Sequence, residues 1–256
     1  MNWNPSQYLK FETPRQRPAL ELLTRVANDA PERICDLGCG TGAMARLMAD
    51  RWPQAHVVGV DASAEMLARA AAAAAARVQW VHANLATWQP ERPLDLIYSN
   101  AALHWLGNHP QLFADLVHRL GPGGVLAVQM PANFAAPSHW EIEATVRQGP
   151  WHQLLEPHLK PDPVASAASY YDLLSPLLAE LDIWETTYLQ VLSGIDPVKE
   201  WTKGTWLAPL LNALPSAQRP LFEEAYAARL RVHYPRRPDG TTLFPFRRLF
   251  IVGRRA

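Results

Sequence analysis

The stretch that decides the fold is "ICDLGCGTGAM", residues 34–44, which holds three glycines and both cysteines of the chain. A short apolar run contains Asp36, and Gly38, Gly40 and Gly42 follow at alternate positions. Glycines suit a turn that a ligand approaches closely, because they accept positive φ and carry no Cβ. Two chemistries compete for this segment: a glycine loop that holds a nucleotide-like cofactor, or a pair of reactive thiols.

The cysteine spacing disfavours the thiol chemistry. Three residues separate Cys35 from Cys39, which is neither the C-x-x-C of redox enzymes nor half of a recognisable zinc site. The nine histidines are scattered, without an H-x-x-x-H pair on a helical pattern, so we expect no metal site. We expect Cys35 to pack into the core and Cys39 to fill a position in the loop.

Strand-like apolar runs alternate with helical patterns over residues 31–130. This order predicts a parallel sheet with helices on both faces, and short continuous apolar strands suit burial on both sides. The seven alanines of residues 70–76 are interpreted as part of a helix, because alanine has the strongest helix propensity. The expected strands are "RICDL", "HVVGV", "VQWVHA", "LDLIYSN" and "GVLAVQM", and the expected helices cover residues 42–52, 63–77 and 111–120.

The pattern changes after residue 130, where the chain becomes Pro-rich and irregular around a helical piece at residues 141–155. A further helix is expected in "SYYDLLSPLLAEL", where Ser169 lies three residues before Asp172 at a capping-box spacing. The β-branched and aromatic segments "DIWETTYLQVL" and "TLFPFRRLFIVGRR" are expected as two final strands, with helices between them.

Together these elements predict one α/β domain over residues 1–256: a doubly wound, mostly parallel seven-stranded sheet with a C-terminal antiparallel hairpin strand and a helical cap insertion. The cofactor-binding core is expected at residues 31–130 and the final sheet strand at residues 243–256. The helical cap is expected to comprise residues 131–182 and 193–242.

Composition limits the partners. Lys plus Arg and Asp plus Glu both number 24, and the pI is near 7.1, so no global field attracts nucleic acid or an anionic membrane. No apolar run reaches the ~18 residues of a membrane span, and "MNWNPSQYLKF" lacks the basic-then-apolar order of a signal peptide. We expect a soluble cytoplasmic protein without nucleic-acid or membrane partners, with a monomer as the working hypothesis.

The acids near the glycines discriminate between cofactors. Gly38, Gly40 and Ala43 alone also satisfy the dinucleotide pattern G-x-G-x-x-G/A. Asp61, 23 residues after Gly38, can accept hydrogen bonds from a ribose in either cofactor class. Asp36 would repel a pyrophosphate and attract an ammonium group. This disfavours a dinucleotide, and a nicotinamide-dependent oxidoreductase stays as the alternative.

The segment "DLGCGTG" resembles the first motif, D-x-G-x-G-x-G, of the class I methyltransferases that use S-adenosyl-L-methionine. The segments "GVDASAEML", "HANLATW" and "LIYSNAALHWL" resemble the next three motifs of that family in order and spacing. The resemblance implies S-adenosyl-L-methionine as cofactor, S-adenosyl-L-homocysteine as product, no metal, and an N-terminal helical arm over the cofactor at residues 1–30. It implies cofactor contacts from Tyr8, Arg17, Asp36, Gly38, Gly40, Gly42, Asp61, Ala62, Met66, Ala83, Asn84, Leu85, Asn100 and Ala101.

One of these positions departs from the family pattern. The family usually has an acid where this chain has Asn84. The amide oxygen of asparagine still accepts a hydrogen bond, so we expect it to receive the adenine amino group with less assistance from charge. Trp88 and Trp105 follow the motifs that the family places at the adenine and methyl ends of the cofactor.

Segments from "WNPSQYLKF" to "FRRLFIVGRR" resemble the branch of this family that forms the monomethyl ester of trans-aconitate. The implied reaction is in-line methyl transfer to a carboxylate, which is already ionised at neutral pH because its pKa is near 4. No general base is needed, so no catalytic residue is expected. The remaining carboxylates of the small polycarboxylate need cations. The substrate-binding candidates are Arg15, His104, Trp105, Tyr170, Tyr171 and Arg248, with Arg17 and Arg247 as further arginines.

Two departures keep another acceptor open. Ala208 stands where the branch tends to have arginine, and Ala132 where it tends to have aspartate. One alternative therefore keeps the cofactor and changes the small-molecule acceptor, and another is a cofactor-binding module without catalysis. The competing interpretations of the site candidates are solvated or ion-paired arginines, tyrosines packed in the core, and His104 packed beside Trp105.

Overall fold

The computed structural model describes residues 12–28, 30–73 and 77–256, with side chains from residue 16 on. The chain forms two compact units. Unit 2 contains Gln16–Pro131, Pro163–Thr186 and Leu249–Ala256, and unit 1 contains Ala132–Asp162 and Thr187–Arg248. Residues 163–182, which the sequence pattern placed in the helical cap, therefore cluster with the cofactor-binding core.

The sheet has seven strands in the order β3-β2-β1-β4-β5-β7-β6. The pairs β1–β2, β1–β4, β2–β3 and β4–β5 are parallel. The order reverses between β1 and β4, and open α/β sheets bind ligands outside the carboxyl ends of strands at such a reversal. The strands are β1 (Arg33–Leu37), β2 (His56–Asp61), β3 (Val78–His82), β4 (Leu94–Asn100), β5 (Leu120–Pro131), β6 (Glu180–Ser193) and β7 (Thr241–Arg254).

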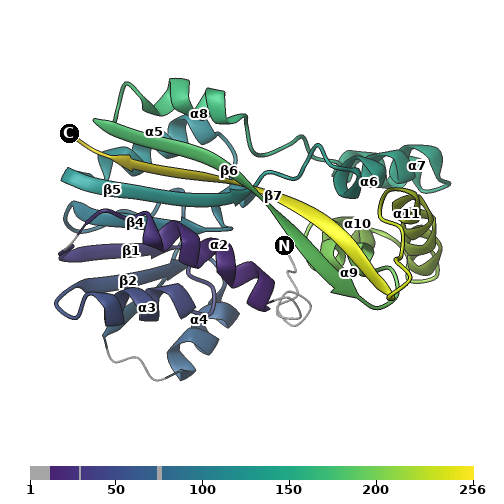
Figure 1. The fold of residues 1–256 in the computed structure, drawn as a ribbon, viewed down its shortest axis with the longest axis horizontal. Coiled ribbons are helices and arrows are strands. Elements are labelled where there is room, and N and C mark those ends of the chain that lie inside the picture. The colour runs from purple at the N-terminus through teal and green to yellow at the C-terminus, as the bar shows by residue number, and fades with distance from the viewer. Residues whose placement is uncertain (1–11, 29, 74–76) are drawn as a thin grey trace. The chain divides into compact units, whose positions relative to one another are not determined.

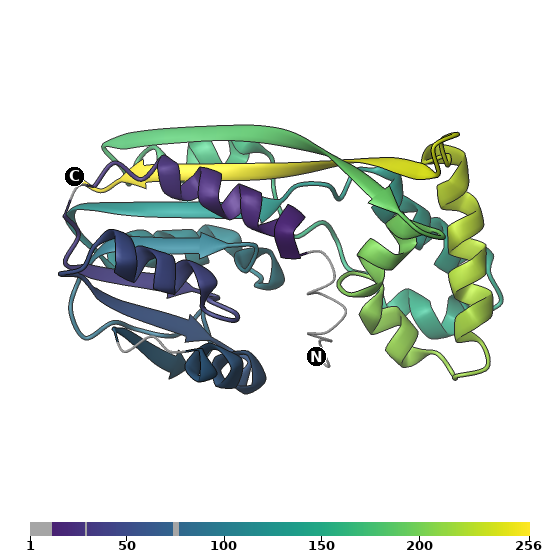
Figure 2. The ribbon, with the colours of Figure 1, turned by 60° about the horizontal axis from the view of Figure 1, so that its bottom comes forward.

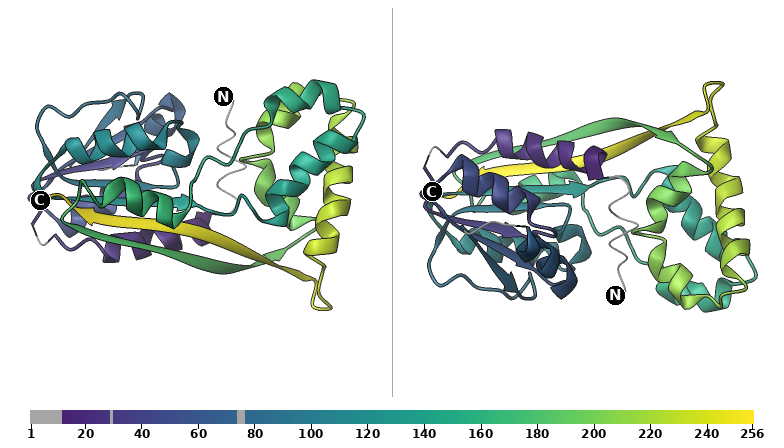
Figure 3. Two further views of the ribbon diagram at one scale, coloured as in Figure 1. Left: turned by 90° about the horizontal axis from the view of Figure 1, so that it is seen from above. Right: turned by 90° about the horizontal axis from the view of Figure 1, so that it is seen from below.

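Helices cover both faces of the unit 2 strands. In Figures 1 and 3, α2 lies on one face of these strands and α5 and α8 lie on the opposite face. This arrangement confirms the predicted doubly wound α/β fold. The helical elements of this part of the chain are α2 (Glu12–Thr24), α3 (Ala43–Arg51), α4 (Ala64–Ala72), the 3-10 turn η1 (Leu103–Trp105), α5 (His109–His118) and α8 (Ala167–Leu174).

The last two strands run side by side, as Figure 2 shows. The amide of Ala179 donates to the carbonyl of Arg254 at 2.8 Å, and the Trp184 ring stacks on Phe250 at 4.8 Å between centroids. The residue number rises along one strand as it falls along the other, so the pair is antiparallel. The expected C-terminal hairpin strand is confirmed.

Unit 1 has its own apolar core. The Trp151 ring packs edge-on against Phe222 at 5.0 Å, and the Trp201 ring lies 5.8 Å from Phe244 and 5.6 Å from Phe246. These tryptophans pack in the core, as expected for most of the ten in the chain. The helical elements around them are α6 (Pro137–Gln148), α7 (His152–Leu155), η2 (Glu156–His158), α9 (Pro197–Lys203), α10 (Ala208–Ala213) and α11 (Arg219–His233).

Three helix predictions need correction. The helix expected at residues 63–77 is α4, which ends at Ala72. Ser166, and not Ser169, caps α8, since its Oγ accepts from the Ser169 amide at 3.1 Å. This helix ends at Leu174, before Pro176, which disfavours helical backbone at the residue preceding it. The single helix expected at residues 141–155 is divided into α6 and α7, because a Gly-Pro pair at 149–150 interrupts it.

The three glycines of the first turn differ in their surroundings. All have positive φ: 82° at Gly38, 54° at Gly40 and 75° at Gly42. A Cβ at Gly38 would lie 2.2 Å from the Ala102 Cβ, and one at Gly42 would lie 2.2 Å from the Trp80 ring. At Gly40 a Cβ would meet no atom within 4 Å. Packing therefore requires two of these glycines, whereas the third faces open space.

We predict that Gly38→Ala destabilises the ligand-free protein more than Gly40→Ala does. Both substitutions place an L-residue at positive φ, at a cost of about 1–2 kcal/mol, but Gly38→Ala also overpacks, which adds about 1–3 kcal/mol. Urea unfolding of the two variants and the parent protein measures the difference. Equal losses would show that packing against Ala102 is not what requires Gly38.

Candidate cofactor-binding site

The glycine turn is held against the end of β2. The amides of Gly38 and Cys39 both donate to the carbonyl of Val60, at 2.8 and 3.1 Å. The next amide of the turn, that of Gly40, donates to Oδ2 of Asp61 at 2.8 Å. The fold of the turn thereby sets the position of the Asp61 carboxylate.

Asp61 is fixed from a second side as well. Its Oδ1 accepts from the Ser63 amide at 2.8 Å, and the Ser63 hydroxyl caps α4 by accepting from the Met66 amide at 3.3 Å. Each oxygen thus has one protein donor, and an ionised carboxylate offers about four lone-pair sites. The partly exposed Asp61 side chain retains the capacity to accept from two hydroxyls of a ribose. Beside it, Ala62 is exposed and Met66 is buried.

Asp36 is a buried carboxylate at the end of β1. The residue is 2% exposed, and among the described residues no group donates a hydrogen bond to its Oδ2. Burial, with the charge of Asp61 as a smaller cause, raises its pKa to about 7. Because an unsatisfied buried acceptor costs free energy, this oxygen favours a ligand that brings a cationic donor.

Asn100 presents a second acceptor at the end of the neighbouring strand β4. Its Oδ1 is buried, also without a hydrogen-bond donor in the described part of the chain. The adjacent Ala101 adopts a left-handed conformation with φ 53°, which is unusual for a residue with a Cβ. β1 and β4 pair directly, so these two acceptors lie at adjacent strand ends. They fit the ammonium group of an amino-acid moiety, which has three donors.

The loop after β3 lies against the glycine turn. The Ala83 amide donates to the Asp61 carbonyl at 3.1 Å, and the Leu85 side chain lies 3.5 Å from the position of a Cβ at Gly38. Asn84 is exposed, and its Oδ1 accepts from the Ala86 amide at 3.0 Å. This oxygen therefore shapes the turn, and its second lone pair remains for a ligand donor.

The turn η1 follows β4 and carries His104 and Trp105. The His104 ring is buried and its centroid lies 4.6 Å from that of Trp105. His109 supports this turn, because its Nε2 bonds the Leu103 carbonyl at 3.1 Å. Its Nδ1 bonds the Tyr170 hydroxyl at 2.5 Å. Burial raises the pKa of Tyr170 to about 12.

These contacts place the two tyrosine candidates differently. Tyr170 is buried, and its hydroxyl bonds a histidine 61 residues away in the sequence, so it joins α8 to α5. The adjacent Tyr171 is 56% exposed.

The arginine candidates Arg17, Arg247 and Arg248 each contact other protein groups. Arg17 is exposed and pairs with Glu21 at 2.8 Å. In unit 1, Arg248 is buried with its guanidinium 4.9 Å from the Phe246 ring centroid, and Arg247 donates through Nε to the Ala132 carbonyl at 2.9 Å. Tyr8 lies outside the described residues, and for Arg15 only the backbone is described.

Two residues that support the site were not anticipated. The Trp80 ring fills the space in which a Cβ of Gly42 or Gly59 would lie, at 2.2 and 2.5 Å. Gly59 pairs with Trp80 across β2 and β3, and a glycine inside a strand is the sequence signal for such close approach. Arg119 donates to the carbonyls of Leu85 and Ala86, at 3.4 and 2.7 Å. No local pattern in the sequence indicates this role of Arg119.

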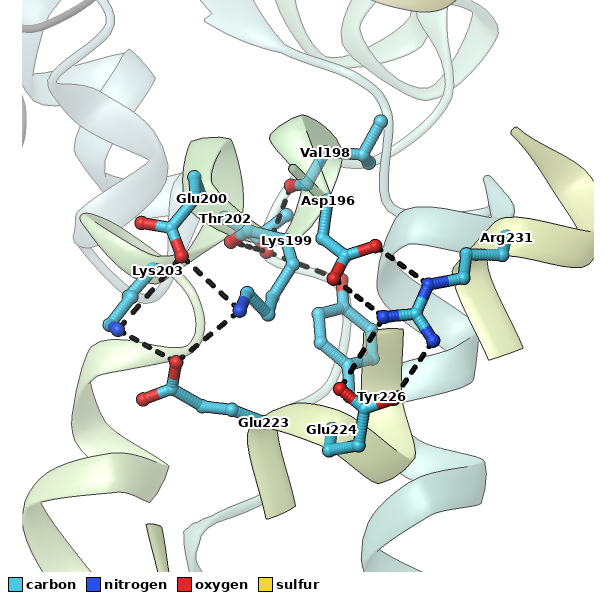
Figure 4. A network of polar contacts seen from close by, with 10 residues as sticks. All are labelled: Asp196, Val198, Lys199, Glu200, Thr202, Lys203, Glu223, Glu224, Tyr226 and Arg231. Carbon is cyan, nitrogen blue, oxygen red and sulfur yellow. Dashed lines mark hydrogen bonds and ion pairs between the residues drawn. The ribbon is translucent and has the colours of Figure 1, made fainter. Parts of the chain in front are cut away.

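A charged network in unit 1 has a different character (Figure 4). Arg231 donates to Asp196 through Nε at 2.8 Å and Nη2 at 2.7 Å, and it pairs with Glu224 at 2.8 Å. Lys203 pairs with Glu223 at 2.7 Å. The hydrogen bonds from Arg231 lower the pKa of Asp196. The carboxylates drawn in this network all have cationic partners, so the network ties α9 to α11.

Neither a candidate metal site nor a membrane-spanning helix is found among the described residues. No group of three or more His, Cys, Asp or Glu side chains in them is arranged to hold a metal ion. None of the helices in the described part of the chain is long and apolar enough to cross a membrane. Both thiols, of Cys35 and Cys39, are free and buried, and burial raises their pKa.

Comparison with solved structures identifies the fold. The YcgJ protein of Bacillus subtilis superposes with a TM-score of 0.61 at 18% identity, over 93% of this chain and 98% of that one. A phosphoethanolamine N-methyltransferase of Haemonchus contortus in complex with S-adenosyl-L-methionine superposes with a TM-score of 0.58 at 15% identity, over 98% of this chain and 56% of that one.

Comparison of sequences identifies the family. The model of the methyltransferase domain matches residues 11–175, which decides against the nicotinamide oxidoreductase. A trans-aconitate 2-methyltransferase of Azoarcus sp. is 47% identical over 98% of both chains. Enzymes of the same name from Pseudomonas aeruginosa and Shigella flexneri are 46% and 43% identical, over 98% and 99% of this chain and 93% and 98% of their own length. The chain therefore belongs to the methyltransferases and, within them, to the trans-aconitate 2-methyltransferase family.

Proposed function

We propose that this enzyme transfers the methyl group of S-adenosyl-L-methionine to one carboxylate of trans-aconitate and forms the monomethyl ester. The observation that carries the proposal is the likeness, over nearly the whole chain, to enzymes named for this reaction. The site geometry supports the same cofactor, because the buried acceptors of Asp36 and Asn100 and the Asp61 carboxylate lie at strand ends around a glycine turn.

Different residues of the described chain are assigned to different parts of the cofactor. In this proposal Asp36 and Asn100 accept from the ammonium group, and the open space at Gly40 admits the chain of the amino-acid moiety. Asp61 accepts from the ribose hydroxyls, and the loop that contains Asn84 contacts the adenine. When bound, the cofactor supplies a methyl group on a sulfonium cation. Further proposed contacts are Tyr8, Arg17, Gly38, Gly42, Ala62, Met66, Ala83, Leu85 and Ala101.

The acceptor needs orientation and exclusion of water more than it needs a base. A carboxylate is ionised at neutral pH, so the protein's task is to align it with the methyl group. We place His104 and Trp105 beside the transferring methyl, and Arg15, Tyr171 and Arg248 at the carboxylates that are not methylated. Tyr170 was expected in the same group. We now propose that it acts on η1 through His109.

A different acceptor is the second candidate, because Ala208 and Ala132 stand where the family tends to have an arginine and an aspartate. Ala208 begins α10, and Ala132 is buried. An arginine lost at the first position removes a cation that could hold a carboxylate. Such a change would favour an acid with fewer carboxylates.

We predict that the purified enzyme transfers radiolabel from methyl-labelled S-adenosyl-L-methionine to trans-aconitate, giving a base-labile monomethyl ester. The panel of acceptors should include cis-aconitate, citrate and a monocarboxylate of similar size, with product identified by mass spectrometry. Transfer to another acid but none to trans-aconitate would replace the substrate and keep the cofactor. A protein that binds S-adenosyl-L-homocysteine and turns over no member of the panel would favour a module without catalysis.

The buried carboxylate predicts a pH dependence of cofactor binding. Asp36 must be ionised to receive an ammonium group, and its pKa of about 7 in the folded protein means that protonation competes below that pH. The Kd for S-adenosyl-L-homocysteine should therefore rise as the pH falls through 7, approaching about tenfold per pH unit, and should level off above it.

Calorimetric titration between about pH 5.5 and 8.5 tests this dependence. The Asp36→Asn variant should bind more weakly at high pH and lose most of the slope, because the amide does not titrate. A slope that survives in Asp36→Asn would assign the pH dependence to another group.

We predict that Asp61→Ala mainly affects the cofactor and that Arg248→Lys mainly affects the acid. Loss of hydrogen bonds to a charged group costs about 1.5–3 kcal/mol, so Asp61→Ala should raise the KM for S-adenosyl-L-methionine by roughly tenfold to a hundredfold. Arg248→Lys keeps the charge but loses the planar fork and should raise the KM for the acceptor. The control is Arg247→Lys, since Arg247 bonds a main-chain carbonyl. Equal effects on both substrates would contradict this division.

A further inference from the structure

We propose that Arg119 is a positioning residue for adenine recognition, because its buried guanidinium fixes the loop of residues 84–88 through two main-chain carbonyls. The inference rests on the proposed function, in which this loop contacts the adenine of S-adenosyl-L-methionine. According to this inference, a residue outside the cofactor motifs contributes to the preference of the enzyme for adenine over other bases.

The loop has little regular structure of its own. It follows β3, and Asn84 organises its first turn: Oδ1 accepts from the Ala86 amide at 3.0 Å, and the carbonyl accepts from the amides of Thr87 and Trp88 at 3.2 and 2.9 Å. These bonds close the turn locally. These local bonds do not set the distance between the loop and the glycine turn. That distance depends on the groups from other elements that contact the loop.

Arg119 supplies that support. Its Nη2 donates to the Ala86 carbonyl at 2.7 Å and its Nη1 to the Leu85 carbonyl at 3.4 Å. The two carbonyls belong to consecutive residues, so the guanidinium holds both the position and the rotation of the peptide unit between them. The Leu85 side chain on the same segment lies against the glycine turn, 3.5 Å from the position of a Cβ at Gly38.

The anchoring residue is buried, and main-chain hydrogen bonds hold its backbone. Arg119 is 5% exposed and lies between α5 and β5, where its amide donates to the carbonyls of Asp115 and Leu116 and its carbonyl accepts from the Leu94 amide at 2.9 Å. Burial lowers the pKa of this arginine, yet it stays charged because the ordinary value is above 12. The side chain thus ties the end of β3 to β5, which are not neighbours in the sheet.

The chemistry of the donor matters for this role. A guanidinium is planar and donates in a fixed fork, so it can bond two carbonyls at once in one orientation. An ammonium group is a point charge on a flexible stem and fixes one carbonyl without fixing the rotation of the peptide. Without either, the buried Leu85 carbonyl and the partly buried Ala86 carbonyl lose a charged donor, and the loop is free to change its distance from the adenine.

The test compares two arginines that bond the same connection between β3 and β4. Arg119→Gln removes the donors to Leu85 and Ala86, whereas Arg33→Gln removes the donor to the Pro93 carbonyl, at 2.6 Å, at the other end of the connection. Calorimetry measures the Kd of S-adenosyl-L-homocysteine and of S-inosyl-L-homocysteine, which differ only in the base. Steady-state kinetics measures the KM of both substrates.

We expect Arg119→Gln to weaken S-adenosyl-L-homocysteine binding about tenfold or more and to reduce the preference for adenine over hypoxanthine. We expect a raised KM for the methyl donor and an unchanged KM for the acceptor, and an intermediate preference in Arg119→Lys. Arg33→Gln should keep the parent preference. A residue that merely stabilised the fold would weaken both homocysteine compounds equally and leave the preference unchanged.

Either an equal loss for both bases or a parent-like preference in Arg119→Gln would overturn the inference. If this variant does not fold, a parent-like preference in Arg119→Lys would do the same. Failure of the proposed function looks different, because the parent protein itself would then not bind S-adenosyl-L-homocysteine.

Discussion

The hydrogen bond from the Gly40 amide to the Asp61 carboxylate is the interaction on which the arrangement of the site depends. It forms because the chain reverses after β1 through glycines at positive φ, with the preceding two amides on the Val60 carbonyl. A Cβ at Gly38 would collide with Ala102, so the loops after β1 and β4 approach each other only because that atom is missing. One tight turn thereby brings together the ends of three strands.

Polar side chains with and without hydrogen-bond partners occur in different parts of the molecule. In unit 2, Asp36 and Asn100 keep buried acceptors without donors in the described part of the chain, which is costly unless a ligand compensates. In unit 1, Asp196 and Glu224 share the guanidinium of Arg231. The first arrangement leaves buried acceptors that a cationic donor would satisfy, and the second joins helices. A shifted pKa alone would not distinguish these two arrangements, because acids in both have one. The hydrogen-bond partners of the acids do distinguish them.

Local patterns predicted the elements that depend on neighbouring residues. The strands β1 to β5 follow from short apolar runs, and the glycine turn and Asp61 follow from spacing along the chain. Local patterns do not indicate contacts between residues that lie far apart in the chain. Tyr170 bonds His109, 61 residues away, and Arg119 reaches carbonyls 33 and 34 residues away. The misplaced cap of α8 is a local error of three residues, since two serines with similar spacing compete for one helix start.

The sequence by itself determined the fold class, the turn and the identity of its acids, because periodicity and backbone permissiveness are properties of short segments. The resemblance of segments along the whole chain also identified the family. Only the tertiary structure showed which groups form and support the candidate site. They are the buried oxygens of Asp36 and Asn100, which have no donor in the described part of the chain, the Trp80 ring at Gly42, and the Arg119 guanidinium at the loop after β3. The physical reason is that burial and hydrogen-bond satisfaction depend on residues from several strands at once, and these come together only when the sheet has formed.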